Sequence, residues 1–437
     1  MGIAEKIIQF TLSKKDYPTH VGHIVNLSLL DWFSVSLAAQ NEPVSRVVRS
    51  CFMEEGGNPE AFVFGSDQKI SSRSAALING TISHALDYDD THFASLGHPS
   101  VTVMPASLAL ADRLGSDLNN FKRAVLCGME IAIRVGAWLG RSHYRKGFHI
   151  TSTAGTFGAT VASAYLLGLN KNQFKMALGL AASRASGIKS QFGTMGKPFH
   201  AGIAASNGVE SALLALKGFV ATEEPFEGPQ SFAETHDSEN NSEIFNSLGT
   251  EFIFESVTHK FHACCHGLHA GMEALIELRE NHLLSPHEIK EIKLIIHPQY
   301  LNVCNILSPR TGLEAKFSFR LTAAMIMWGV DTARLESFSN SVCSNTSFTE
   351  LRDKVFIETN GNLSETAASA KITMFDGRVF TDNHDLSKLA DPKLREKKVR
   401  SKSNSLIGQE HSEKVWQAIT EKITHVEKPI SKLLLDL

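Results

Sequence analysis

The sequence has 437 residues, of which 43% are hydrophobic and 20% are charged. This composition is globular and excludes a disordered or fibrous chain. The net charge of −3, from 43 Lys and Arg against 46 Asp and Glu, excludes the broad basic surface that binds nucleic acid. At about 150 residues per domain the length suggests roughly three units, but one large and one smaller domain fit as well. We interpret the chain as two domains.

The longest apolar run, at 323–328, is much shorter than the roughly 18 residues that a membrane-spanning helix needs. Residues 1–6 lack the apolar core of a secretory signal and the hydroxyl residue of a myristoylation signal. The six cysteines are irregularly spaced, so they do not form a disulfide framework. We therefore expect a soluble, cytoplasmic protein without a membrane partner.

Apolar residues recur at helical spacing from residue 20 to about 220, as in Val21, Val25 and Trp32. Many of these segments are rich in Ala, Gly and Ser, which let helix backbones approach closely. The pattern predicts a tightly packed helical domain with several central helices buried on most sides. The same spacing recurs in 121–139, 158–167, 174–185 and 204–216.

The pattern changes near residue 285, where Ser-Pro-His-Glu at 285–288 has the form of a capping box and predicts a helix start. Alternating apolar residues at 292–296 and 355–357 predict strands. Residues 370–382 predict a hairpin with a type I′ turn at Asp376-Gly377. A helix is expected at 314–328 and another at 411–423.

The predicted architecture is therefore mainly α with an α+β second domain. A large all-helical domain takes residues 1–264 and the α+β domain takes 265–390. Periodicity leaves open which of the two domains the helical pattern after residue 390 joins.

Polar residues cluster near predicted helix ends, where free N–H groups and the helix dipole favour anions. Asp87 to His92 followed by His98 could be a catalytic loop, or a solvated loop with Ser100 as helix cap. His149 and Thr151 begin a helix, and Thr194 precedes Lys197 at another helix start. Lys197 opposes the dipole there, so we interpret it as an anion ligand or a base with a lowered pKa.

Two further clusters leave more alternatives open. On a helix, the pairs His262/His266 and Cys265/His269 would share faces, which allows a zinc site, a Cys nucleophile, a metal-free polar site or plain packing. Lys316 would lie four residues from Arg320 on one helix face, either as an anion site or as a solvated basic face. The dinucleotide, P-loop and Gly-x-Ser-x-Gly patterns are missing from the sequence. Together the clusters suit proton transfer next to a carboxylate.

The motifs in these clusters resemble those of the MmgE/PrpD family, in order along almost the whole chain. They are NGT at 79–81, HALDYDDT at 84–91, GHPS at 97–100, GFH at 147–149, FGTM at 192–195, KP at 197–198, HAG at 200–202, the cluster at 260–269 and AKFS at 315–318. The resemblance implies that residues 391–437 complete the helical domain, that the second domain is a smaller α+β lid and that the protein is a homodimer. It also implies metal-free reactions without a cofactor on small polycarboxylates, by 2-methylcitrate dehydratases, cis-aconitate decarboxylases or iminodisuccinate epimerases.

Carried over to this sequence, the family's active-site positions are matched by six residues: Asp87, Thr91, His98, His149, Lys197 and Lys260. The decarboxylase pattern has His where Cys265 stands and Tyr where Leu321 stands. These departures disfavour decarboxylation, and the residues around 192–208 and Leu321 are more similar to the epimerase branch.

Our leading hypothesis is a dehydratase that acts by α-proton abstraction and β-elimination. His98 and His149 would exchange protons, Asp87 would orient an imidazole, and Lys197 and Lys260 would bind carboxylates. Thr91, Thr151, Thr194, Cys265, His269 and Lys316 are expected to contact substrate. Epimerisation or decarboxylation is the enzymatic alternative, and a zinc-stabilised or carboxylate-binding module is the non-enzymatic one.

Overall fold

The computed structural model describes residues 1–13, 15–388 and 391–420. These form two compact units, which we call the helical unit (Met1–His259 together with residues from Ile407 onward) and the mixed unit (Lys260–Leu406). The expected division at 390/391 differs from this one, because helix α15 (Pro392–Ile407) falls almost entirely in the mixed unit. There Lys398 of α15 pairs with buried Glu273 at 2.5 Å.

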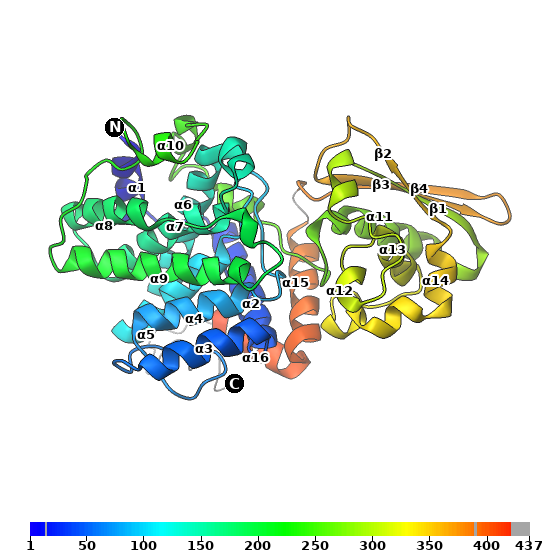
Figure 1. Cartoon of the computed structure of the whole chain (residues 1–437), viewed down its shortest axis with the longest axis horizontal. Helices are drawn as coiled ribbons and strands as arrows, with labels where there is room; N and C mark the ends of the chain where they lie inside the picture. Colours follow the sequence, from blue (N-terminus) through cyan, green and yellow to red (C-terminus); the bar gives the residue numbers. More distant parts are fainter. Residues whose placement is uncertain (14, 389–390, 421–437) are drawn as a thin grey trace. The chain divides into compact units, whose positions relative to one another are not determined.

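The helical unit contains the helices labelled α1 to α10 in Figure 1, which are coloured blue to green, and α16 near the C-terminus. As the sequence predicts, the first half of the chain is helical, and α16 joins it by packing on α2, with the rings of Trp416 and His23 6.1 Å apart. The helices are α1 (Ile3–Leu12), α2 (Thr19–Ala39), α3 (Pro43–Glu55), α4 (Ser72–His84), α5 (Ser100–Leu114), α6 (Leu118–Lys146), α7 (Ile150–Leu166), α8 (Lys171–Arg184), α9 (Gly196–Leu216), α10 (Phe232–Thr235) and α16 (Gln409–Thr420).

The central helices of this unit are buried on most sides, as their small residues predict. Every residue of α7 from Ile150 to Ala164 is buried. Helices α4 and α9 touch at glycines, and a Cβ built on Gly202 would lie 2.2 Å from the carbonyl oxygen of Leu77. Close backbone contact therefore holds α4 and α9 together, and the N-terminal end of α9 and the C-terminal end of α4 both carry site residues described below.

Helix α2 is the one helix of the described residues that is long and apolar enough to cross a membrane. Of the most apolar 18-residue stretch of this helix, 67% is buried within the structure. Trp32, Val25 and Leu30 are among the side chains that bury this helix in the core. This burial is typical of a core helix in a soluble protein.

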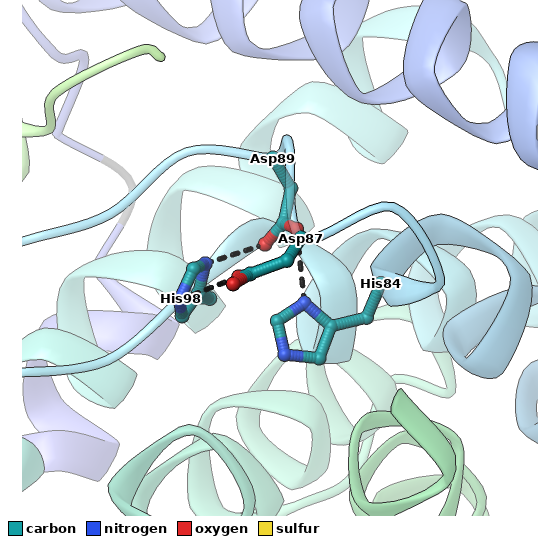
Figure 2. Close-up of side chains that lie close together, drawn as sticks. All are labelled: His84, Asp87, Asp89 and His98. Atoms are coloured by element: carbon teal, nitrogen blue, oxygen red, sulfur yellow. Dashed lines mark hydrogen bonds and ion pairs between the residues drawn. The ribbon is translucent and has the colours of Figure 1, made fainter. Parts of the chain in front are cut away.

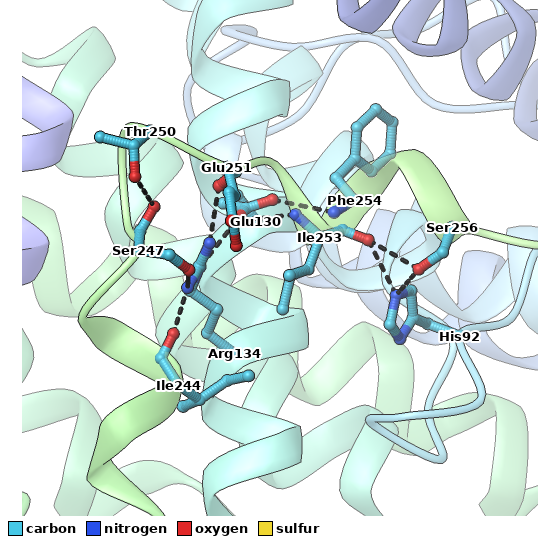
Figure 3. A network of polar contacts seen from close by, with 10 residues as sticks. All are labelled: His92, Glu130, Arg134, Ile244, Ser247, Thr250, Glu251, Ile253, Phe254 and Ser256. Atoms are coloured by element: carbon cyan, nitrogen blue, oxygen red, sulfur yellow. Dashed lines mark hydrogen bonds and ion pairs between the residues drawn. The ribbon is translucent and has the colours of Figure 1, made fainter.

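A buried ion pair fixes the segment that leads to the end of the helical unit (Figure 3). Arg134 Nε donates to Glu130 Oε1 at 2.6 Å, and both side chains are fully buried. The Glu130 carboxylate also accepts the backbone N–H of Phe254 at 2.9 Å, and Arg134 Nη2 donates to the carbonyl of Glu251 at 2.7 Å. The pair on α6 thereby holds this loop against the helix.

We expect Arg134→Ala to lower the free energy of unfolding by about 3–5 kcal/mol, because it leaves the Glu130 carboxylate buried without its partner. Chemical denaturation followed by circular dichroism measures the change. Lys171→Ala is the matched control, since it removes a half-exposed ion pair with Glu5 and is expected to cost less than about 1 kcal/mol. Equal effects of the two substitutions would contradict the expectation.

The mixed unit is built on a four-stranded sheet of order β2-β1-β3-β4. Strand β1 pairs parallel to β2 and antiparallel to β3, and β3 pairs antiparallel to β4. The alternation expected at 292–296 is confirmed, with Ile292, Leu294 and Ile296 buried. The elements are β1 (Ile289–Ile296), β2 (Val355–Thr359), β3 (Ala367–Met374), β4 (Val379–Asp385), α11 (His269–His282), α12 (Gly312–Ala315), α13 (Phe319–Met327), α14 (Thr346–Arg352) and α15.

Local details of the mixed unit differ from the sequence prediction. Residues 285–288 form only a 3-10 turn, η5 (Pro286–Glu288), because strand β1 begins at once and its pairing takes the backbone hydrogen bonds. In the β3–β4 hairpin only Gly377 has a positive φ, of 91°, and Met374 N–H bonds to the Arg378 carbonyl. The turn is therefore a three-residue loop with a left-handed glycine, not a type I′ turn.

The helix expected at 314–328 is interrupted. Helix α12 ends at Ala315, and α13 begins after Ser318, whose hydroxyl accepts the N–H of Leu321 at 3.3 Å and so caps the second helix. Lys316 and Arg320 consequently belong to different helical segments and do not share a helix face. Of the helix expected at 411–423, residues up to 420 form α16 and the remainder lies outside the described residues.

Candidate active site

A shared carboxylate lies at the centre of the histidine-rich loop after α4 (Figure 2). Asp89 Oδ1 lies 2.9 Å from His84 Nδ1, and Asp89 Oδ2 lies 2.8 Å from His98 Nδ1. Asp89 and His84 have fully buried side chains, and that of His98 is 13% exposed. One carboxylate thus orients two imidazoles, from the end of α4 and from the turn before α5.

The protonation of this group follows from its contacts. Burial favours the neutral acid of Asp89, but the two imidazoles outweigh it and hold the pKa of Asp89 far below its usual range. An ionised carboxylate only accepts hydrogen bonds, so both Nδ1 atoms carry the proton. Burial lowers the pKa of His98 to about 4, although Asp89 acts in the opposite direction. Neutral His98 therefore presents an unprotonated Nε2, the atom that a general base needs.

Asp87 and Lys197 lie on the Nε2 side of His98. Lys197 Nζ is 2.8 Å from Asp87 Oδ1, and His98 Nε2 is 3.5 Å from the same oxygen. Lys197 is the second residue of α9, so the Asp87 carboxylate offsets a cation that the helix dipole disfavours. Asp87 itself has φ of 50° and a side chain 47% exposed, at a left-handed turn of the loop.

This arrangement changes one expected role. Asp89, rather than Asp87, makes the close contact that orients His98, because the turn at Asp87 points the two carboxylates to different atoms of the same ring. Asp87 instead holds Lys197 in place.

His149 forms a second histidine contact in the same unit. It is the residue before α7, and its Nδ1 lies 3.1 Å from Nδ1 of His200, so one ring donates and the other accepts. Burial, followed by the nearby His84 and Lys197, lowers the pKa of His149 well below its usual value. The rings of His149 and His84 lie 6.1 Å apart, and Lys197 Nζ lies 5.5 Å from the Phe192 ring that packs on His149. The His149 pair therefore borders the Asp89 group.

The threonines of the helical unit have different positions. Thr151 Oγ1 accepts the backbone N–H of His98 at 3.1 Å, so it fixes the loop of that residue. The backbone of Thr91 bridges to Thr258, which ties the loop to the segment before His259. Beside it, His92 Nε2 lies 2.8 Å from the hydroxyl of Ser256 (Figure 3). Thr194 bonds locally, to Gln191 and to the N–H of Gly196, at the start of α9.

Ser100 is not the N-cap of α5, contrary to one interpretation of the sequence. Helix α5 begins at Ser100 and its preceding residue is Pro99. The carboxylate of Asp90 accepts the Ser100 N–H at 3.2 Å, which satisfies one of the free donors at this helix start. Burial raises the pKa of Asp90 to about 7.

The remaining candidate residues lie in the mixed unit. Lys260 is buried, and the backbone N–H of Cys265 donates to the carbonyl of Lys316 at 3.1 Å. His269 is the first residue of α11, and burial lowers its pKa well below the usual value. The structure thus brings Cys265 and Lys316 together, whereas Asp87, His98, His149, Thr151 and Lys197 form the group in the helical unit.

The helical geometry expected for zinc at 262–269 is wrong. Residues 260–265 are not helical, η4 (His266–Leu268) follows, and α11 begins only at His269. His262 Nδ1 instead forms a hydrogen bond with Thr332 Oγ1 at 2.7 Å. Its Nε2 lies 3.4 Å from Oε1 of Glu273. The two residues of each pair, His262/His266 and Cys265/His269, therefore do not share a helix face.

Among the described residues, a different group is close enough to share a metal ion. One donor atom from each of His84, Asp87, Asp89 and His98 lies within 4.8 Å of the others. Two imidazoles and two carboxylates are a suitable ligand set for zinc or iron. However, the Asp89 oxygens and the Nδ1 atoms already bond to one another, so an ion would have to replace these hydrogen bonds. The expectation of a metal-free site stays a prediction.

Three members of the group in the helical unit were not chosen from the sequence: His84, Asp89 and His200. All three stand in the motifs HALDYDDT and HAG, which were recognised. The signal that could have selected Asp89 is its place two residues from Asp87 in a loop with histidines on both sides. His200 gave no such signal, because its partner His149 is 51 residues away.

Comparison with known proteins agrees with this reading of the motifs. Models of the MmgE/PrpD N-terminal domain and the MmgE/PrpD C-terminal domain match residues 3–244 and 262–427. A cis-aconitate decarboxylase-like protein of Aspergillus oryzae is 29% identical over 291 residues, which are 62% of this chain and 60% of that protein. The chain therefore matches about three fifths of that relative's length.

Two mammalian proteins are also similar to this chain. Human cis-aconitate decarboxylase is 28% identical over 75% of this chain and 71% of its own, and the mouse enzyme is 26% identical over 82% and 76%. A decarboxylase is a lyase, so these relatives support lyase-type chemistry. With family models matching most of its residues and the motif histidines gathered around Asp89, the chain belongs to the MmgE/PrpD family.

Proposed function

We propose that this protein is a cofactor-independent lyase that removes an α-proton from a small polycarboxylate and expels a β-hydroxyl group as water. The observation that carries the proposal is the contact between Asp89 and His98 Nδ1, which leaves Nε2 free of a proton. When His98 takes the proton from carbon, the imidazolium forms next to an ionised carboxylate that stabilises it.

Lys197 supplies the charge that a carboxylate substrate needs. Within the described residues, the only ion pair of its ammonium group is the one with Asp87. The Asp87 side chain is half exposed. A substrate carboxylate at this place would replace Asp87 as the partner of Lys197. The ammonium would also offset the negative charge that develops on the carboxylate as the α-proton leaves.

We propose that His149 donates the proton to the leaving hydroxyl group. In the free protein its pKa is lowered, so the ring is neutral at pH 7. A bound polyanion would raise this pKa, because an opposite charge stabilises the imidazolium. His200, 3.1 Å away, would then accept a hydrogen bond from the charged ring. Two imidazoles in different surroundings can therefore act as base and acid.

Decarboxylation is the second candidate, because the relatives above are cis-aconitate decarboxylases. In that reaction the carbanion left by carbon dioxide takes a proton from one of the same imidazoles. Cys265 and Leu321 stand where the decarboxylase pattern has His and Tyr, which disfavours decarboxylation. Epimerisation would need a proton to be returned to the opposite face of the same carbon, without loss of a group.

We also propose further substrate contacts in the mixed unit, because of the family resemblance and the positive charge of the two lysines. They are Lys260, Cys265, His269 and Lys316. We also propose a cytoplasmic homodimer on the resemblance. Light scattering of the purified protein measures the oligomeric state, and a monomer mass would overturn the dimer.

Proton NMR in D₂O distinguishes the reactions. Chelator-treated protein is incubated with 2-methylcitrate, citrate, cis-aconitate and iminodisuccinate in separate samples. New vinyl signals from a hydroxy acid are expected. Loss of carbon dioxide from cis-aconitate would favour the second candidate, and α-proton exchange without elimination would identify an epimerase. Silence with all four compounds would overturn the proposed substrate class.

The pH dependence of kcat/KM tests the role of His98. Since His98 must be neutral to accept a proton and its pKa is about 4, we expect the limb of kcat/KM that reports His98 to lie near pH 4. Above it, kcat/KM should rise as the pH drops from 7 towards 5, because His149 must bind a proton to act as the acid. An exposed histidine would lose activity near pH 6.5. Protein held at each pH and assayed again at pH 7 controls for acid unfolding. A reversible fall centred at pH 6.5 would contradict the assignment.

A further inference from the structure

Two cysteine side chains of the mixed unit meet across a gap of 39 residues. Sγ of Cys304 lies 3.1 Å from Sγ of Cys265, and neither cysteine is in a disulfide bond. Cys265 is half-buried just before η4, whereas Cys304 is fully buried after η6 (Pro298–Asn302). A disulfide is about 2.05 Å long, so the two sulfurs need to approach by only about 1 Å to form one.

The backbone on both sides of the pair is held by hydrogen bonds. Cys265 N–H donates to the carbonyl of Lys316 at 3.1 Å, and Cys304 N–H donates to the carbonyl of Tyr300 at 2.9 Å. The missing side chain of Gly267 makes room for the pair, because a Cβ there would lie 2.6 Å from the Tyr300 ring and 3.1 Å from Cys304 Sγ. The proximity of the thiols is therefore part of the local packing.

The neighbouring Cys264 has different surroundings. Its side chain is buried, and its Sγ lies 3.6 Å from Sδ of Met272. Burial raises the pKa of the Cys264 thiol, and the hydrogen bond to Cys265 together with burial raises the pKa of the Cys304 thiol, so neither is the thiol that reacts first with an oxidant. Of the two adjacent cysteines, only Cys265 combines partial exposure with a second thiol at hand.

We propose that Cys265 and Cys304 are a redox modification site that forms a reversible disulfide with a peroxide as oxidant. The thiolate of Cys265, the exposed member, attacks one oxygen of hydrogen peroxide, which breaks the O–O bond and gives a sulfenic acid and, with a proton, water. The Cys304 sulfur, on losing its proton, then attacks Cys265 Sγ and expels a second water. Two thiols are oxidised and one peroxide is reduced to two waters. A cytoplasmic dithiol reductant would restore the thiols.

The disulfide would join the turn before α11 to the turn after η6 and would occupy the sulfur of Cys265. Because Cys265 is also a proposed substrate contact, any loss of activity on oxidation rests on the proposed function. The modification itself does not, so it is tested by a measurement that needs no substrate.

The test is peptide mapping of the full-length protein after treatment with hydrogen peroxide. Remaining thiols are blocked with N-ethylmaleimide, and the protein is digested with trypsin without reduction. Cleavage at Lys260, Arg279, Lys293 and Arg310 places Cys304 on peptide 294–310, and both Cys264 and Cys265 on peptide 261–279. We expect these two peptides to be linked, and the link to disappear after dithiothreitol.

Two variants assign the link to its sulfurs. Cys264→Ser is the matched control and should keep the linked pair, since Cys264 contacts Met272 instead. Cys304→Ser should lose it and leave a Cys265 sulfenic acid that dimedone traps. Maleimide on both Cys265 and Cys304 after peroxide treatment of the unmodified sequence would overturn the proposal. A link that disappears in Cys264→Ser would overturn it as well.

Discussion

Replacing His98 with glutamine is expected to lower kcat by about 10²–10⁴-fold, the usual contribution of a positioned general base. Glutamine keeps a hydrogen-bonding side chain of similar reach but cannot accept a proton at neutral pH. The side chain of His98 is 13% exposed, and its backbone N–H remains bonded to Thr151 in the variant, so the loop should keep its position. Steady-state kinetics on the substrate identified by NMR measures the effect.

His20→Gln is the matched control for this experiment. His20 is an exposed histidine that pairs with Glu255 at 3.0 Å, outside the Asp89 group, and its loss should leave kcat unchanged. The thermal unfolding temperature of both variants checks that they are folded. Full turnover by folded His98→Gln would remove His98 from the mechanism, and with it the central assignment.

Asp89→Asn is the second substitution with a large expected effect. The amide has a single acceptor oxygen, so it cannot accept hydrogen bonds from His84 Nδ1 and His98 Nδ1 as the carboxylate does. Its NH₂ group would favour the wrong tautomer of one ring. We expect kcat to fall by about 10²–10⁴-fold, because an imidazole in the wrong tautomer is not a base at Nε2.

The pH profile separates this positioning role from a merely structural one. The negative charge of Asp89 raises the pKa of His98, against the larger effect of burial. Its removal should therefore move the acid limb of kcat/KM to lower pH, below the limb near 4 of the unmodified protein. A structural defect would lower the rate without moving the limb in that direction.

Asp87→Asn is the control for the same experiment, since this carboxylate contacts Lys197 at 2.8 Å and lies 3.5 Å from His98. We expect its main effect on KM, because Lys197 is the proposed carboxylate ligand. An unchanged kcat in Asp89→Asn together with a large fall in Asp87→Asn would reverse the roles that the geometry indicates.

The helices and strands could be predicted because each follows from a local rule. The helical spacing at Val21, Val25 and Trp32 places them on one face, and all three are buried in the structure. The alternation of Ile292, Leu294 and Ile296 in the same way predicted the buried face of strand β1. The family motifs, which are local strings, identified His98, His149 and Lys197 as candidates. The predictions that failed, such as the helix expected at 285–288 and the unbroken helix at 314–328, depend on which neighbour takes the backbone hydrogen bonds.

The sequence by itself determined the helical and mixed composition of the chain and most of the polar residues of the site. Only the tertiary structure decided that Asp89 is shared by His84 and His98, and that His149 meets His200. It also brought Cys304 to Cys265. The physical reason is that periodicity reports which face of an element is buried, whereas a hydrogen bond between distant residues depends on loop angles such as the φ of 50° at Asp87. Such angles are set by the packing of the whole unit.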